Sequence, residues 1–247
     1  MFDYPSVVII FNMLILIAVA VVIVVAVRQA QKRRKEWQAF AASRGWRYIH
    51  LDRNFFREWR QEPFGRGSSR RATDIVEGTY HGVPFRGFTY QYTVSSGKSS
   101  TTYHHRVLQI PTAAVHLPMM QIRSGRRLAL TKDIQFESDN FNDAFDVRGL
   151  DKRFVFKIVH PQFMAALLDG ALGQYHYSIE NGVFTLWERQ RLSPYEVDEM
   201  AARLTHLLAL VPSHVWADAR VAPPPLDPGR GPGPASPHFS IAAPQHG

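Results

Sequence analysis

The sequence predicts an α+β protein with one N-terminal transmembrane helix and a mainly antiparallel, curved β-sheet domain that a C-terminal helix covers. Three observations lead to this prediction. Residues 7–27 form one apolar run, residues 74–187 repeatedly alternate apolar and polar side chains, and residues 193–211 carry apolar side chains at helical spacing. A curved sheet closed by a C-terminal helix is analogous to pleckstrin-homology-like domains, and this analogy predicts no function.

The apolar run at residues 7–27 reads VVIIFNMLILIAVAVVIVVAV, with Asn12 as its only strongly polar residue. As a helix this run is roughly 32 Å long, which matches a hydrocarbon core of about 30 Å. A secretory signal peptide needs a basic leading segment and a shorter apolar core, whereas residues 1–6 contain no Lys or Arg. We therefore expect a membrane anchor that is retained.

The positive charge is concentrated directly after the anchor. The net charge is +8, and residues 28–71 hold 13 basic and 4 acidic residues, while residues 72–247 hold equal numbers of both. Basic residues beside a span stay in the cytoplasm, so we expect the N-terminus outside and the domain in the cytoplasm. This placement predicts binding to anionic lipid headgroups rather than to nucleic acid, with a protein partner as a second candidate. The predicted headgroup-binding residues are Arg28, Lys32, Arg33, Arg34 and Lys35.

Composition divides the chain into five parts. Half of the 16 prolines lie in the last stretch, after residue 221, which predicts a disordered tail there. The expected parts are a short N-terminal segment (1–6), the transmembrane helix (7–27), a basic juxtamembrane helix and loop (28–71), the α+β domain (72–221) and the tail (222–247).

The first half of the domain is predicted to be mainly β. Residues 29–45 keep helical spacing, and Gly45 can end that helix. Residues 75–80 and 83–94 then predict a β-hairpin around His81-Gly82. Two further strands are expected, one at residues 103–110 and one at residues 115–122 that Pro118 interrupts.

The second half is predicted to be mixed. Residues 152–159 predict a strand, and residues 161–168 predict a short helix that begins with Pro161. Residues 175–187 form the clearest hairpin, because Asn181-Gly182 is a preferred two-residue turn. Ser193-Pro194-Tyr195-Glu196 is a capping box, and it begins the helix that is expected to cover the sheet.

One loop has the composition of an anion-binding loop. Residues 63–71 contain Gly65, Gly67, Arg70 and Arg71, so backbone N–H and guanidinium groups could surround a phosphate. A flexible polar loop is the alternative interpretation. The later sequence Gly97-Lys98-Ser99-Ser100 does not predict a nucleotide site, because a tyrosine stands where a Walker A loop needs its first glycine.

The sequence predicts no catalytic residue, no metal site and no cofactor. It contains no cysteine, which excludes thiolate metal ligands and a cysteine nucleophile. His104 and His105 are adjacent, so on a strand they would point to opposite faces and could not chelate one ion together.

An acidic island covers residues 133–151. It does not match an EF-hand, because Phe141 and Ala144 stand where a ligand and the glycine are required. One interpretation is structural, with Ser138 or Asp139 capping a short helix. The other is a hydrolase site assembled from the island and a downstream histidine. That site would need a deep pocket shared by two or more of Asp139, Asp143, Asp146 and His160.

The island also carries a resemblance. The sequence FESDNFNDAFDV at residues 136–147 is followed by Asp151 and by IVHPQFM at residues 158–164. This pattern resembles a bacterial family of unknown function whose members have an N-terminal membrane anchor. Residues 44–48 and 62–67 are similar to its members from high-GC Gram-positive bacteria, and the likeness covers roughly residues 36–212. The resemblance implies a bacterial membrane-anchored protein and brings no activity, cofactor or catalytic residue with it.

The sequence therefore favours a non-enzymatic module that binds a partner or a lipid surface at the cytoplasmic face of the membrane. The alternative is a membrane-anchored hydrolase that uses residues 133–151 and His160. A pocket formed by the island would favour the hydrolase, and side chains that cap helices or face solvent there would favour the module.

Overall fold

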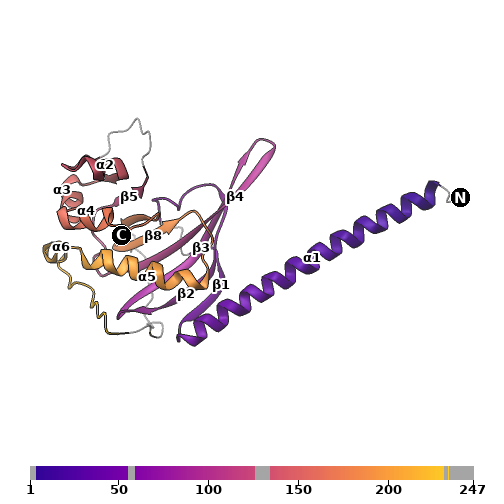
Figure 1. Ribbon diagram of the computed structural model, residues 1–247, viewed down its shortest axis with the longest axis horizontal. Coiled ribbons are helices and arrows are strands. Elements are labelled where there is room, and N and C mark those ends of the chain that lie inside the picture. The colour runs from indigo at the N-terminus through magenta and orange to yellow at the C-terminus, as the bar shows by residue number, and fades with distance from the viewer. Residues whose placement is uncertain (1–3, 55–58, 126–133, 231–232, 234–247) are drawn as a thin grey trace, which may run out of the picture.

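The computed structural model describes residues 4–54, 59–125, 134–230 and 233, with side chains from residue 11 onward. It consists of one long N-terminal helix and an eight-stranded, antiparallel, curved sheet with further helices packed against it (Figure 1). The predicted α+β fold is therefore confirmed. The strand order across the sheet is β1-β2-β3-β4-β8-β7-β5-β6.

Neighbouring strands form one continuous sheet although β5 and β6 precede β7 and β8 in the chain. The strands are β1 (Arg47–Asp52), β2 (Ser68–Tyr80), β3 (Val83–Ser96), β4 (Ser99–Pro111), β5 (Met120–Ser124), β6 (Phe145–Gly149), β7 (His176–Glu180) and β8 (Val183–Glu188). The helices are α1 (Tyr4–Ser43), α2 (Asp139–Ala144), α3 (Lys152–Ile158), α4 (Pro161–Leu168), α5 (Pro194–Ala209) and α6 (Ser213–Asp218).

The first helix, α1, joins the apolar run to the domain without a break. It contains 40 residues, so it is roughly 60 Å long. From Phe11 onward, α1 is long and apolar enough to cross a membrane. The rest of the chain buries none of its most apolar stretch. The helix ends at Ser43, two residues before Gly45, whose positive φ of 69° turns the chain away from the helix as predicted.

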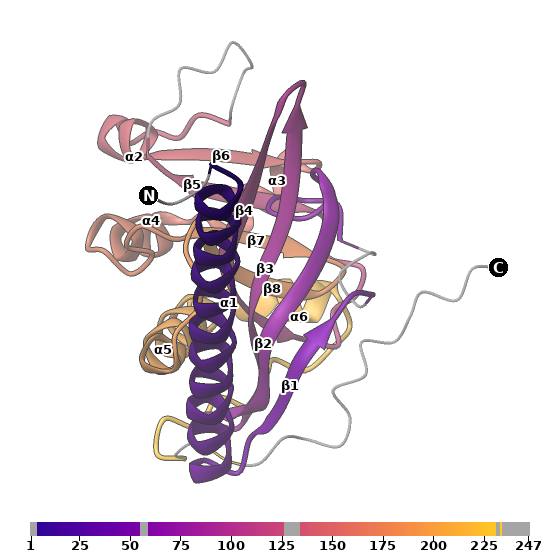
Figure 2. The same ribbon diagram turned by 90° about the vertical axis from the view of Figure 1, so that its right-hand side faces the viewer.

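The sheet has two different faces, because side chains alternate along each strand. The face that α5 covers holds the larger core, which includes Phe85, Leu108, Phe184 and Leu204. Figure 2 shows α2, α4 and α5 on this side of the sheet. The predicted covering helix is therefore present, and its capping box of Ser193 and Glu196 is formed.

The opposite face is covered by residues 59–67, which we call the strap. Trp59 and Phe64 of the strap are buried against Phe88 and Tyr90 of β3. The backbone N–H groups of Arg60 and Gln61 both donate to the carboxylate of Glu180, at 3.0 and 3.1 Å. Burial and hydrogen bonds together fix the strap on the sheet.

Two predicted strands differ from the structure. The strand predicted at residues 152–159 is wrong, because this segment forms the helix α3 with Asp151 as its N-cap. The strand predicted at residues 115–122 begins only at Met120, after Pro118. The sheet also begins earlier than expected, since β1 pairs with β2 and lies within the segment predicted as juxtamembrane.

The first residues of the proline-rich tail lie along the domain. The Asp227 N–H donates to the His81 carbonyl at 2.9 Å, and Gly233 forms a β-bridge with Thr79. Leu226 packs against the main core. The remaining residues of the predicted tail, 231–232 and 234–247, lie outside the described residues.

Candidate membrane-proximal basic site

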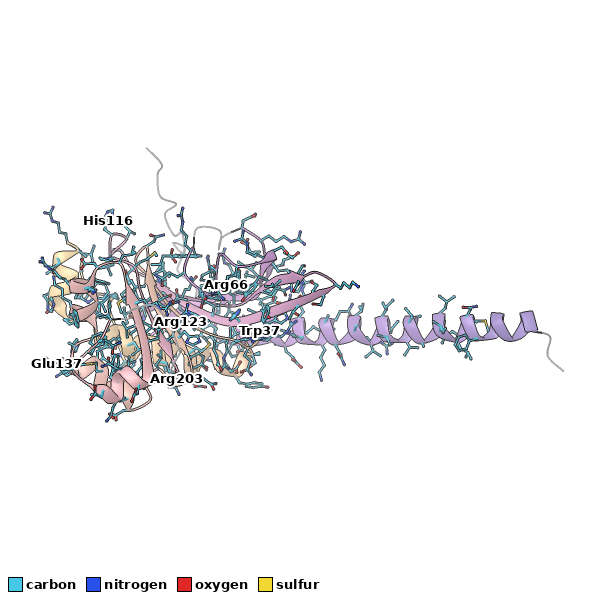
Figure 3. All side chains as sticks on the ribbon, turned by 90° about the horizontal axis from the view of Figure 1, so that it is seen from above. Trp37, Arg66, His116, Arg123, Glu137 and Arg203 are labelled. Atoms are coloured by element: carbon cyan, nitrogen blue, oxygen red, sulfur yellow. The ribbon has the colours of Figure 1, made fainter. Side chains whose placement is uncertain are left out.

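The end of α1 is docked on the domain by a row of aromatic rings. Trp37 is 1% exposed, and its ring lies 6.0 Å from that of Phe40. Trp46 continues the row, 5.5 Å from Phe40 and 4.8 Å from Phe85 of β3. Figure 3 shows Trp37 where α1 meets the domain. The apolar helix and the domain are thus held by side-chain packing as well as by the chain itself.

An ion pair joins α1 to β2 of the sheet. Arg33 donates to the carboxylate of Asp74 at 2.5 Å, and the Asp74 side chain is only 7% exposed. The Tyr48 hydroxyl donates to the same carboxylate at 3.1 Å, and burial followed by the charge of Asp74 raises the Tyr48 pKa. Arg33 lies six residues after Val27, which places this contact only ~9 Å beyond the apolar run.

Further arginines gather beside this contact. Arg71 of β2, Gln91 of β3 and His104 of β4 are directly opposite one another across three strands, so their side chains share one face. Arg191, in the loop after β8, lies 3.0 Å from the His104 ring. Burial, followed by the charges of Arg191, Arg33 and Arg71, lowers the pKa of His104. The positive charges of Arg33 and Arg71 therefore both lie close enough to His104 to lower its pKa.

These cations form what we call the basic site. It combines the predicted headgroup-binding residues with Arg71 and with Arg191, and no pattern in the sequence points to Arg191 as a site residue. Its members are Arg28, Lys32, Arg33, Arg34, Lys35, Arg71 and Arg191. All of them except Arg33 are exposed. Across the described residues, Asp74 is the only carboxylate that forms an ion pair with this site.

The four residues of the predicted anion-binding loop do not form one cradle. Arg71 faces the basic site, whereas Arg70 lies beside the Tyr90 hydroxyl on the opposite face of the sheet. Gly67 has a positive φ of 62°, and a Cβ there would lie 2.4 Å from the Thr93 carbonyl oxygen. Gly65 also has a positive φ, of 77°. Both glycines are explained by the path of the strap, and only Arg71 joins the cationic surface.

Within the acidic island, Ser138 and Asp151 cap the helices α2 and α3. The Ser138 hydroxyl accepts a hydrogen bond from the Phe141 N–H, as one interpretation predicted, and the Asp151 carboxylate accepts from the N–H groups of Arg153 and Phe154. Asn142 bonds both the N–H and the carbonyl of Phe136, at 2.9 and 2.7 Å. The residues that carry the family resemblance therefore organise the chain around α2 and α3.

The proposed hydrolase residues are not brought together in the described part of the chain. Asp146 of β6 pairs with Arg148 on the strap face, at 2.9 Å. His160 precedes α4 on the other face, and its Nε2 lies 3.0 Å from the Leu210 carbonyl oxygen. Asp139 and Asp143 are exposed. Three cavities lined by described residues, beside the strap, beside β5 and β6, and beside α3 and α6, include none of these four side chains.

Nothing in residues 11–54, 59–125, 134–230 and 233 resembles a metal site, since no group of three His, Cys, Asp or Glu side chains has suitable geometry. His104 and His105 point to opposite faces of β4, as predicted from their adjacency. His104 lies beside Arg191, and His105 stacks on Tyr92 with ring centroids 5.6 Å apart.

Comparison with known proteins gives one informative likeness. No family model matches the chain, and no curated protein matches it. Among solved structures, the chain is similar to the crystal structure of the mycobacterial trehalose monomycolate transport factor A, TtfA, with a TM-score of 0.52 and 14% sequence identity. The match covers 72% of this chain and 95% of that chain. At this identity, the likeness shows a shared α+β fold.

Proposed function

We propose that the protein is a non-enzymatic, membrane-anchored module whose domain is held against anionic lipid headgroups at the cytoplasmic face of the membrane. The observation that carries this proposal is the continuity of α1. One helix runs from the apolar segment through five closely spaced cations into the core of the domain. The domain therefore has no flexible connection that would let it move away from the lipid surface.

The charge distribution supports both the orientation and the headgroup contact. Arg28, Lys32, Arg34 and Lys35 lie directly after the apolar run, which favours a cytoplasmic domain. Arg71 and Arg191 extend this charge from α1 onto the domain itself. Each basic residue near an anionic membrane contributes about 1 kcal/mol of attraction, so the combined contribution favours close contact.

The likeness to TtfA supports a more specific candidate within the same class. A transport factor for trehalose monomycolate has this fold, and we propose that this protein likewise assists the transport of a membrane lipid without catalysing a reaction. The resemblance of residues 136–164 to a membrane-anchored bacterial family supports the membrane anchoring in this proposal and adds no activity to it. A protein partner in the membrane would be required for such transport.

Hydrogen–deuterium exchange of the full chain in nanodiscs tests the headgroup contact. We expect slower amide exchange at residues 68–73 and 189–193 when phosphatidylglycerol is added to phosphatidylcholine. About 1 M salt should remove the difference, because the Debye length there is only about 3 Å. Replacing both Arg71 and Arg191 by Gln should have the same effect as salt.

The matched control is the pair Arg153→Gln and Arg220→Gln. Both residues are exposed and lie near α3 and α6, on the side of the domain away from the apolar part of α1 (Figure 1). This pair removes the same charge and should leave the lipid-dependent difference intact. Exchange that is identical in both lipid mixtures, or that responds equally to both pairs of substitutions, would refute the headgroup contact.

A further inference from the structure

A cavity of about 320 Å³ lies between the strap and the sheet, on the face opposite α5. Arg66 of the strap lines it together with side chains from β3, β4, β5, β7 and β8. Figure 3 shows Arg66 and Arg203 of α5 on opposite sides of the domain. This volume lies within the range of small-molecule sites, which begins at about 300 Å³.

Aromatic rings form one wall of the cavity. Tyr103 and Tyr92 are stacked with centroids 5.4 Å apart, and Tyr92 is nearly parallel to the His105 ring, at 5.6 Å and 9°. Trp187 meets His105 edge to face at 5.7 Å. These rings pack on one another across neighbouring strands and form a continuous aromatic surface against which a flat or ring-shaped group can pack.

Buried polar groups in this wall have no hydrogen-bond partner within the described chain. His105 is 6% exposed, and neither of its ring nitrogens is bonded. The indole N–H of Trp187, which is 4% exposed, is also unpartnered. Leaving such a group unbonded costs roughly 1–3 kcal/mol, so these atoms are expected to bond to a ligand that enters the cavity.

The cavity carries an excess of positive charge. Arg66 and Arg123 both pair with the carboxylate of Glu62, the second at 2.5 Å, and Arg123 also donates to the Gln121 side chain. Arg189 lies over the Tyr103 ring with its guanidinium carbon 4.4 Å from the centroid, and it has no carboxylate partner among the described residues. Arg66 and Arg189 together carry one more positive charge than Glu62 carries negative charge, which leaves this cavity suited to an anion.

We propose that this cavity binds a phosphate monoester, with Arg189 and Arg66 holding the phosphate and the aromatic wall holding the group that it esterifies. Arginine matches phosphate because its planar fork donates two parallel hydrogen bonds. His105 and Trp187 supply the further bonds to phosphate or hydroxyl oxygens. The site lies on the face of the sheet opposite the main core and uses none of the basic-site residues, so it is independent of the proposed headgroup contact.

Two sources can present this chemistry. One is a soluble sugar phosphate. The other is a lipid headgroup such as that of phosphatidic acid, because Val94 of the β3–β4 hairpin lines the cavity and this hairpin projects toward the same side as the apolar part of α1 (Figure 1). The experiment therefore needs one arm for each source.

For the soluble arm, glucose 6-phosphate is titrated by calorimetry into the full chain in phosphatidylcholine nanodiscs. We expect a Kd below ~1 mM and at least roughly tenfold weaker binding of unphosphorylated glucose. For the lipid arm, phosphatidic acid is added to the nanodiscs. Competition with glucose 6-phosphate, or slower amide exchange at residues 59–67, assigns the site to the lipid headgroup.

Substitutions decide whether either effect belongs to this cavity. Arg189→Gln and His105→Phe should each weaken binding roughly tenfold or more, whereas Arg153→Gln on α3 should leave it unchanged. Arg189 is exposed, so its substitution should not unfold the domain, and unchanged thermal unfolding checks this. Absence of an Arg189-dependent effect in both arms would overturn the proposal, whatever the result of the headgroup test on Arg71 and Arg191.

Discussion

His105 illustrates how one residue acquires its properties from packing. Its adjacency to His104 predicts that the two side chains lie on opposite faces of a strand, and they do. Its burial follows from neighbours on other strands and on the strap, which sequence spacing does not specify. Burial, followed by the charges of Arg189 and nearby groups, lowers the His105 pKa to about 4. The ring is therefore neutral at neutral pH.

This lowered pKa predicts how stability depends on pH. In the unfolded chain a histidine has a pKa of about 6.5, so the unfolded state binds a proton that folded His105 does not bind between pH 6.5 and 4. The free energy of unfolding should fall as the pH falls through this window, by about 2–3 kcal/mol from this group. Urea unfolding of the full chain in detergent at several pH values measures the loss.

The variant His105→Phe is the comparison for this prediction. It keeps a ring against Tyr92 and Trp187 and removes the titration, so its unfolding free energy should decrease less between pH 6.5 and 4. Because His104 and other groups titrate equally in both proteins, the difference between them isolates His105. Equal pH dependence in the two proteins would mean that His105 binds its proton equally well in the folded and the unfolded chain, and it would contradict the lowered pKa.

Residues whose partners are nearby in the chain were the most predictable. Ser138 and the Ser193–Glu196 capping box bond to N–H groups within three residues, and both were expected from the sequence. Asp74 and Arg191 were missed as site residues. Their partners are Arg33 and His104, and each pairing depends on the register of the sheet and on how α1 docks.

Among secondary-structure elements, α3 shows where short apolar patterns mislead. Residues 152–159 form a short, mainly apolar run, which periodicity alone cannot assign to a strand or a helix. Phe154, Val155 and Ile158 lie on one face of the helix, and all three are buried. The Asp151 side chain accepts hydrogen bonds from two N–H groups of the first turn, at 2.8 and 3.2 Å. The cap and the buried face together favour the helix.

The cap predicts a measurable loss of stability. Replacing Asp151 by Ala leaves two N–H groups without their acceptor and should lower the free energy of unfolding by about 1 kcal/mol. Glu137→Ala is the matched control, because Glu137 is an exposed carboxylate in the same region and forms no hydrogen bond or ion pair with the described residues (Figure 3). Equal destabilisation by both substitutions in denaturant unfolding would mean that the cap contributes nothing specific.

A second prediction concerns the contact between β2 and the segment that follows α1. A Cβ at Gly78 would lie only 2.2 Å from Cδ1 of Trp46, so the indole can rest there only because residue 78 is glycine. Gly78→Ala should therefore displace Trp46 and destabilise the domain by about 1–3 kcal/mol.

Gly229→Ala provides the control for Gly78→Ala, since a Cβ at Gly229 would meet its nearest neighbour at an ordinary 3.4 Å. Thermal unfolding together with the emission maximum of the tryptophans reports both stability and the displacement of Trp46. An unchanged emission spectrum and an unchanged Tm in Gly78→Ala would show that the indole is not held against this strand.

At the scale of the whole molecule, α1 sets both the distance and the direction of the domain relative to the membrane. The sequence predicts the apolar segment, the charge beside it and the helix that follows, because all three are visible in consecutive residues. The sequence does not show that Trp37 and Ala41 belong to the domain core, because their core neighbours lie far away along the chain. The charge pattern therefore predicts a separate juxtamembrane segment at residues 28–71, whereas part of this segment contributes to the domain core.

The docking of α1 makes the domain depend on this helix. Trp37→Ala should lower the free energy of unfolding of the domain by about 3–5 kcal/mol, as expected for a fully buried tryptophan. Gln38→Ala, at the neighbouring exposed position, should change it by less than about 0.5 kcal/mol. If Trp37→Ala and Gln38→Ala lowered the free energy of unfolding of the full chain equally, the domain would fold independently of α1.

The orientation of the domain can be measured with single cysteines, because the natural chain contains none. Tyr195 is 92% exposed at the start of α5, so Tyr195→Cys would carry a reactive thiol on the domain surface. In cells that express the full chain, a membrane-impermeant maleimide should label Asp3→Cys in intact cells and Tyr195→Cys only after lysis. Labelling of Tyr195→Cys in intact cells would place the domain outside and contradict the proposed cytoplasmic, headgroup-facing role.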